Sequence, residues 1–128
     1  IPTIAKRLRD VGVDVFDDWY AAGPEADDLW RKYEEERGRG YIQALEEGWH
    51  ADHVFQYDKT HLDFSDAGVL VLPAGRSGHL ELGYLIGQEK PGYILLDNPE
   101  RWDCMYAFAT RVYTKLDDLV KNFVEVTF

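Results

Sequence analysis

Residues 68–83, read as GVLVLPAGRSGHLELG, constrain the fold of this chain more than any other stretch. The run 68–72 is short and almost entirely apolar, and it ends at Pro73, a pattern typical of a strand buried on both faces of a parallel sheet. A glycine-rich loop at 74–78 follows, and residues 79–90 then repeat apolar side chains at helical spacing. A buried strand, a tight loop and a helix in this order predict one unit of an α/β domain.

The same alternation of helical and extended segments runs along the whole chain. Helices are predicted at 3–11, 24–37, 41–47, 50–65, 105–109 and 115–123, and further strands at 13–17, 91–97 and 111–113. Crossover helices between parallel strands cover both faces of the sheet, so we expect a single three-layer α/β domain over residues 1–128. A doubly wound domain normally leads with a strand, and we therefore expect a first strand upstream of Ile1.

Charge and cysteine content exclude several classes of partner. The formal net charge of −10 argues against a nucleic-acid duplex or an anionic membrane, although a small anionic ligand still fits where Arg side chains and amides gather. Cys104 is the single cysteine, which rules out an intramolecular disulfide and a cysteine-based zinc site and favours a cytoplasmic location. No apolar run approaches the roughly 18 residues of a membrane span.

Glu81 stands in the helix predicted at 79–90, where apolar side chains leave little solvent face near the start. Soluble proteins seldom place a carboxylate in such surroundings, so its presence requires a reason. A capping box is excluded because Gly78, three residues earlier, has no side chain to reciprocate. Two interpretations stay open: Glu81 serves only the helix dipole, or it is a nucleophile or electrostatic stabiliser at the carboxyl edge of the sheet.

An ordered series of motifs surrounds this glutamate. The series comprises Asp58, Leu62 and Asp66 at intervals of four, the apolar run 69–72, the glycine-rich loop 75–78 and the letters HLELGY at 79–84. It resembles the pattern of the nucleoside 2-deoxyribosyltransferase-like family, which includes nucleoside 2-deoxyribosyltransferases and nucleotide N-glycoside hydrolases. The resemblance covers about half of the chain well and implies a flavodoxin-like domain with a mostly parallel sheet.

The resemblance implies cleavage of an N-glycosidic bond, with Glu81 attacking the anomeric carbon and Asp58 handling protons or orienting the reacting groups. A sugar that leaves its base passes through an oxocarbenium-like state, which a carboxylate beneath the anomeric carbon stabilises. The transferases commonly carry another Asp six residues before the Glu, where this chain has Gly75. An anion is favoured instead by Arg76, Ser77 and the free amides of a helix N-terminus, so we expect a 5′-phosphate on the substrate. We also favour a hydrolase over a transferase.

Four further residues are assigned to substrate binding. Gly78 and His79 belong to the same loop and helix start, while Trp19 and Tyr20 follow the predicted strand 13–17 and could stack on a nucleobase. His79 fits the role of a helix cap equally well, and the aromatic pair fits packing under a lid.

His50 and His53 have the spacing of helical metal ligands, but no HExxH pattern or third ligand accompanies them. We therefore expect no metal and no other cofactor. Asp66 is expected to mark the turn into its strand rather than to take part in chemistry, because the amino ends of the strands lie opposite the binding edge.

The sequence thus predicts a cytoplasmic enzyme that cleaves the N-glycosidic bond of a (deoxy)nucleoside 5′-monophosphate. Two alternatives stay open: a TIR-like glycohydrolase acting on NAD, and a nucleotide-binding module without turnover. Relatives in the family often complete each active site with a neighbouring subunit, so the resemblance also implies a homo-oligomer built from dimers. Aromatic residues on polar helices agree with such contacts: Trp30, Tyr33, Trp102 and Tyr106.

Overall fold

The computed structural model describes residues 2–17, 24–96 and 102–125. The chain divides into two compact units. The first unit combines Ile1–Asp17 with Ser65–Phe128, and the second is Asp18–Phe64. The single domain expected over residues 1–128 stays a prediction.

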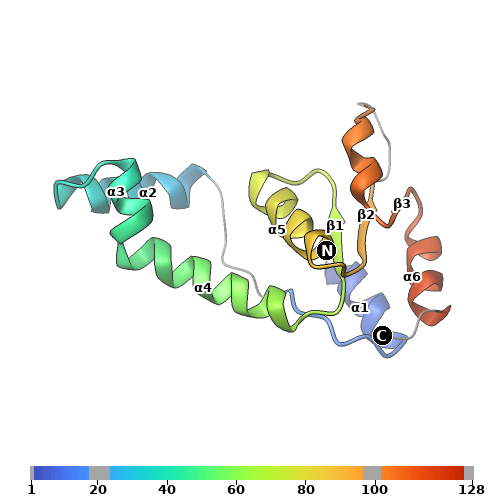
Figure 1. The fold of residues 1–128 in the computed structure, drawn as a ribbon. Helices are drawn as coiled ribbons and strands as arrows, with labels where there is room; N and C mark the ends of the chain where they lie inside the picture. Colours follow the sequence, from blue (N-terminus) through green and yellow to red (C-terminus); the bar gives the residue numbers. More distant parts are fainter. Residues whose placement is uncertain (1, 18–23, 97–101, 126–128) are drawn as a thin grey trace. The chain divides into compact units, whose positions relative to one another are not determined.

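The first unit is built on a parallel sheet of three strands (Figure 1). Its strands are β1 (Gly68–Val71), β2 (Gly92–Leu95) and β3 (Arg111–Tyr113), in the order β1-β2-β3. Both strand pairs are parallel, with Leu70 opposite Ile94 and Leu95 opposite Tyr113. Together with the helices of the described ranges, this all-parallel open sheet confirms the predicted flavodoxin-like α/β fold.

Helices cover both faces of this sheet because the side chains of each strand alternate between the faces. On one face, Tyr93, Leu95 and Tyr113 pack against α1 (Pro2–Asp10) and α6 (Leu116–Glu125). On the other face, Leu70 and Ile94 pack against α5 (Arg76–Gly87), together with a short 3₁₀ helix, η1 (Cys104–Phe108). The result is the three-layer arrangement that the sequence predicts.

Two glycines let α5 approach the sheet closely. A Cβ atom at Gly68 would lie 2.5 Å from Leu85 Cδ1, and one at Gly92 would lie 2.7 Å from Ile86 Cγ1. Both distances are shorter than non-bonded carbon atoms tolerate, so a side chain at either glycine would force Leu85 or Ile86 to move. The close packing of α5 in turn fixes the loop that precedes it.

The second unit consists of three helices, α2 (Pro24–Glu36), α3 (Tyr41–Glu47) and α4 (Trp49–Phe64). Its most buried charged residue is Glu34, whose side chain is 3% exposed and whose Oε2 accepts a hydrogen bond from Arg39 Nη1 at 2.9 Å. A Cβ atom at Gly48, between α3 and α4, would lie 3.1 Å from Glu34 Oε1. The partly buried ion pair therefore ties the end of α2 to the segment that follows it, and Glu34 also lies beside the junction of the next two helices.

The prediction of a strand at residues 13–17 is wrong, because this segment has no regular secondary structure. Arg9 holds it instead: Nη2 of Arg9 donates to the carbonyl oxygen of Val15 at 2.9 Å and to Asp17 Oδ1 at 3.0 Å. Val13 and Val15 are half-buried and pack against the cluster under α1 and α6. The apolar side chains of this segment thus pack on the core without forming a strand. The strand expected upstream of Ile1 stays a prediction.

No helix in the described ranges is long and apolar enough to cross a membrane.

The central role of α6 in the core generates a stability prediction. Leu119 on α6 is 0% exposed, whereas Val124 on the same helix is 64% exposed. Leu119→Ala is expected to lower the free energy of unfolding by about 3 kcal/mol because it opens a cavity under the sheet. Val124→Ala is the control and is expected to change it by less than about 0.5 kcal/mol. Urea unfolding measures both, and equal losses would contradict the assignment of α6 to the core.

Candidate functional site

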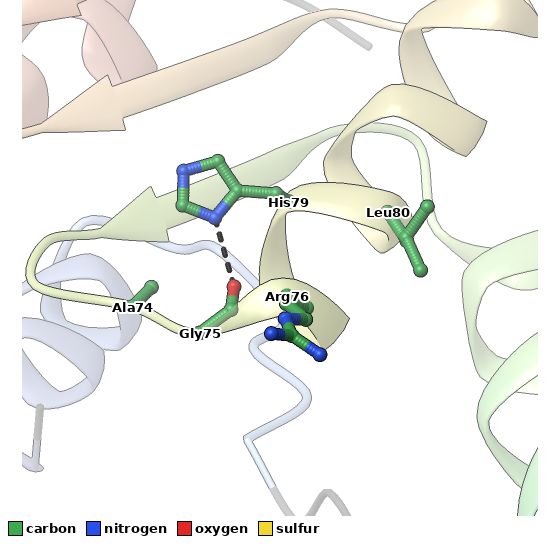
Figure 2. A pocket seen from close by; sticks show the side chains of 5 residues that line it. All are labelled: Ala74, Gly75, Arg76, His79 and Leu80. Atoms are coloured by element: carbon green, nitrogen blue, oxygen red, sulfur yellow. Dashed lines mark hydrogen bonds between the residues drawn. The ribbon is translucent and has the colours of Figure 1, made fainter.

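A surface pocket lies at the carboxyl end of β1, where the chain turns into α5. Five residues line it: Ala74, Gly75, Arg76, His79 and Leu80 (Figure 2). It is a shallow depression of about 570 Å³ that is widely open to solvent, not an enclosed cavity. Ligands of open α/β sheets bind outside the carboxyl ends of the strands, so this is the expected edge.

The first turn of α5, which borders this pocket through Gly75 and Arg76, begins without a side-chain cap. Gly75 is the N-cap residue, has an extended backbone (φ −82°, ψ −167°) and provides no side-chain cap. The first helical hydrogen bond runs from the amide of His79 to the carbonyl oxygen of Gly75 at 3.4 Å. The amides of residues 76–78 precede it, and an uncapped first turn of this kind attracts anions.

Arg76 adds a positive charge to the lining of the pocket. Its side chain is exposed and forms no ion pair with any residue in the described ranges. In a chain with a net charge of −10, such an unpaired guanidinium beside uncapped amides favours an anionic ligand. Ser77 is exposed in the same turn but does not line the pocket.

Gly78 has a packing role that its sequence context does not reveal. A Cβ atom at this position would lie 2.8 Å from Leu70 Cδ1. The absence of a side chain thus lets the first turn of α5 rest on β1, which sets the height of the amides above the sheet.

His79 connects the pocket to a residue that the sequence did not assign to the site. Its Nδ1 lies 2.8 Å from the carbonyl oxygen of Gly75, and its Nε2 lies 2.9 Å from the hydroxyl oxygen of Tyr106 in η1. The two rings are stacked, with centroids 5.8 Å apart. Tyr106 is separated from His79 by 27 residues, so no local motif in the sequence indicates this contact.

Glu81 is half-buried and lies in the second turn of α5, because the helix begins at Arg76 rather than at residue 79 as predicted. The field of the helix dipole falls off within the first turn, so the dipole explains this carboxylate less well than the sequence suggested. The expected shortage of solvent face is also wrong, because Leu80 is 75% exposed. Glu81 does not line the pocket, but it follows Ser77 by four residues and therefore shares its helix face.

Asp58 lies in the middle of α4, is half-buried and belongs to the second unit. Glu81 belongs to the first unit, and the relative positions of the two units are not determined. The structure therefore brings together Gly75, Arg76 and His79, whereas the meeting of Asp58 with Glu81 stays a prediction.

The remaining candidates divide into three cases. Trp19 and Tyr20 lie outside the described residues. His53 stacks on Trp49, with ring centroids 5.0 Å apart, and the described ranges hold no group of three or more His, Cys, Asp or Glu residues arranged for a metal ion. Asp66 is exposed in the turn that leads into β1, at the amino end of the strand.

Comparison of the chain with protein-family models and with curated proteins finds no match to either.

Proposed function

We propose that this protein cleaves the N-glycosidic bond of a (deoxy)nucleoside 5′-monophosphate, and we favour a hydrolase over a transferase. The observation that supports this most is the order of groups along α5. Uncapped amides and the unpaired Arg76 stand at its first turn, beside a pocket at the carboxyl end of β1. A half-buried carboxylate, Glu81, follows about one turn later.

The spacing of these groups suits a nucleotide. One helical turn rises about 5 Å, which is of the same order as the span from a 5′-phosphate across the sugar to the anomeric carbon. A phosphate bound at the first turn of α5 would therefore bring the anomeric carbon to the level of Glu81. The remote phosphate would supply binding energy that orients the reacting bond.

The proposed chemistry has two steps. The carboxylate of Glu81 attacks the anomeric carbon, the C–N bond breaks, and its electron pair leaves with the base, which takes up a proton. Water then hydrolyses the glycosyl ester, which releases a 5-phosphosugar and regenerates the carboxylate of Glu81. Asp58 is proposed to hold or move the protons.

Base release from nucleotides tests the enzyme proposal. We expect chromatography to detect free base after incubation with at least one member of a panel of ribo- and deoxyribonucleoside 5′-monophosphates. Glu81→Gln should lower this rate by at least about 10³-fold, because it removes the nucleophile while keeping the shape of the side chain. Glu89→Gln, at an exposed position just after α5, is the matched control and should retain full activity.

Three results would contradict parts of this proposal. Turnover retained in Glu81→Gln would reassign the nucleophile. Nicotinamide release from NAD without base release from mononucleotides would favour the TIR-like alternative. Binding of a monophosphate with no product after long incubation would favour a module without turnover.

The assignment of Arg76 to the phosphate generates a separate prediction. Arg76→Ala should raise the KM for the 5′-monophosphate by about 10-fold or more and leave the KM for the matching nucleoside nearly unchanged, because only the monophosphate carries the anion. Arg111→Ala is the matched control, since Arg111 is exposed at the amino end of β3. Equal effects of Arg76→Ala on both substrates would show that Arg76 does not contact a phosphate.

We also propose that the functional unit is a cytoplasmic homo-oligomer built from dimers. Large apolar side chains are exposed on the single chain, among them Trp102 at 90% and Tyr33 at 45%. Trp30 and Tyr106 agree less well with this role because both are half-buried, and Tyr106 packs against the cluster beneath α5.

Light scattering across a salt series tests the assembly. The net charge of −10 opposes association at low ionic strength, so an apolar contact should persist or tighten as salt screens the repulsion. A mass of at least twice 14.8 kDa is expected. The monomer mass at every salt concentration would contradict the oligomer.

A further inference from the structure

Three hydrogen-bonding groups form a continuous chain beside the pocket. The carbonyl oxygen of Gly75 can only accept a hydrogen bond, so Nδ1 of His79, 2.8 Å away, carries the proton between them. In the neutral imidazole the other nitrogen, Nε2, is then an acceptor, and the hydroxyl of Tyr106 donates to it at 2.9 Å. In the protonated imidazole Nε2 donates to the same hydroxyl oxygen, so the chain survives either state of His79.

Tyr106 is itself held firmly at the far end of this chain. Its ring packs against the cluster of Leu70, Leu82 and Ile94 beneath α5. The 3₁₀ helix that carries it is capped by Asp103, whose Oδ1 accepts a hydrogen bond from the amide of Met105 at 2.9 Å. The hydroxyl of Tyr106 is therefore a fixed point to which His79 is tied.

Gly75, by contrast, has little else to hold it. It is exposed, its side chain is absent, and a Cβ atom there would meet nothing within 4 Å. The backbone hydrogen bond that its carbonyl oxygen accepts from the amide of His79 is long, at 3.4 Å. The shorter bond from the ring of His79 thus contributes strongly to the orientation of this peptide, whose nitrogen side is the amide of Arg76.

We propose that Tyr106 is a positioning residue of the site: acting through the Nδ1–H tautomer of His79, it fixes the carbonyl of Gly75 and so orients the amide of Arg76, which belongs to the same peptide group, toward an anionic ligand. The inference rests on the proposed function, because it assigns that ligand to the first turn of α5. In this role His79 links η1 to the loop before α5. Both of its ring nitrogens then have hydrogen-bond partners within the protein, so neither binds the substrate.

Tyr106→Phe tests the proposal with little risk to folding, because the ring and its packing remain and only the hydroxyl is lost. Two-bond ¹H–¹⁵N spectra report the tautomer of His79. Anion binding is measured by titration with inorganic phosphate, which is followed by the chemical shifts of the amides of residues 76–78. The wild type should show the Nδ1–H form. The variant should show a mixture of both tautomers and a phosphate Kd raised about 5-fold, the effect of one ordinary hydrogen bond.

Tyr113→Phe is the matched control, because Tyr113 packs on the opposite face of the sheet, under α1 and α6. It should change neither the tautomer nor the Kd. A double-mutant cycle adds a further check: in a His79→Ala background, Tyr106→Phe should have almost no additional effect on the phosphate Kd, because the two residues act through one chain.

The outcomes separate this inference from the proposed function. A wild type that binds phosphate at these amides, together with an unchanged Kd in Tyr106→Phe or an Nε2–H form of His79, overturns the role of Tyr106 alone. A wild type that binds neither inorganic phosphate nor any nucleoside 5′-monophosphate overturns both. Additive effects of the two substitutions would show that Tyr106 and His79 act independently.

Discussion

The close packing of α5 on a sheet that is covered on both faces is the constraint on which the first unit depends. All four residues of the central strand β2 are buried, so neither face of this strand can be left to water. Gly68 and Gly92 make room for Leu85 and Ile86 of α5 on one side. The lack of side chains at these two positions leaves the space that Leu85 and Ile86 occupy against the first residues of β1 and β2.

The candidate site follows from that packing. The first turn of α5 rests on Leu70 through Gly78, its N-cap Gly75 leaves the amides uncapped, and Arg76 brings a positive charge to a strongly acidic chain. These features are suited to holding an anion at the end of a substrate. In the proposed function Glu81, which lies about one turn further along and does not line the pocket, attacks the anomeric carbon of the substrate. The proposed reaction thus uses a rigid helix to set the distance between binding group and nucleophile.

Much of this fold can be predicted from the sequence, because local signals mark the ends of its elements. The helix Tyr41–Glu47 and the strand Arg111–Tyr113 have the predicted bounds, and β1 is shorter than predicted by one residue. The start of α5 is predicted three residues too late. Arg76, Ser77 and Gly78 read as loop, and they become helical where Gly78 packs against Leu70, a contact that no local pattern encodes.

The site is less predictable than the fold for a related reason. The lining residues Gly75, Arg76 and His79 are close in sequence, so a local pattern can indicate them. Tyr106 lies 27 residues beyond His79, and its role depends on how η1 packs on the sheet. At 13–17 the sequence predicts a strand that does not form. Arg9 donates a hydrogen bond to the carbonyl oxygen of Val15 there, a contact that the local sequence does not indicate.

Trapping the glycosyl-enzyme intermediate tests most directly the proposal that Glu81 becomes covalently attached to the sugar. A nucleoside 5′-monophosphate with a 2-fluoro sugar destabilises the oxocarbenium-like state and slows both steps, so the glycosyl ester should accumulate on the protein. Mass spectrometry of the intact protein should show the added mass of the fluorinated phosphosugar, and peptide mapping should place it on Glu81. An adduct on another residue, or release of base without any adduct, would contradict the account.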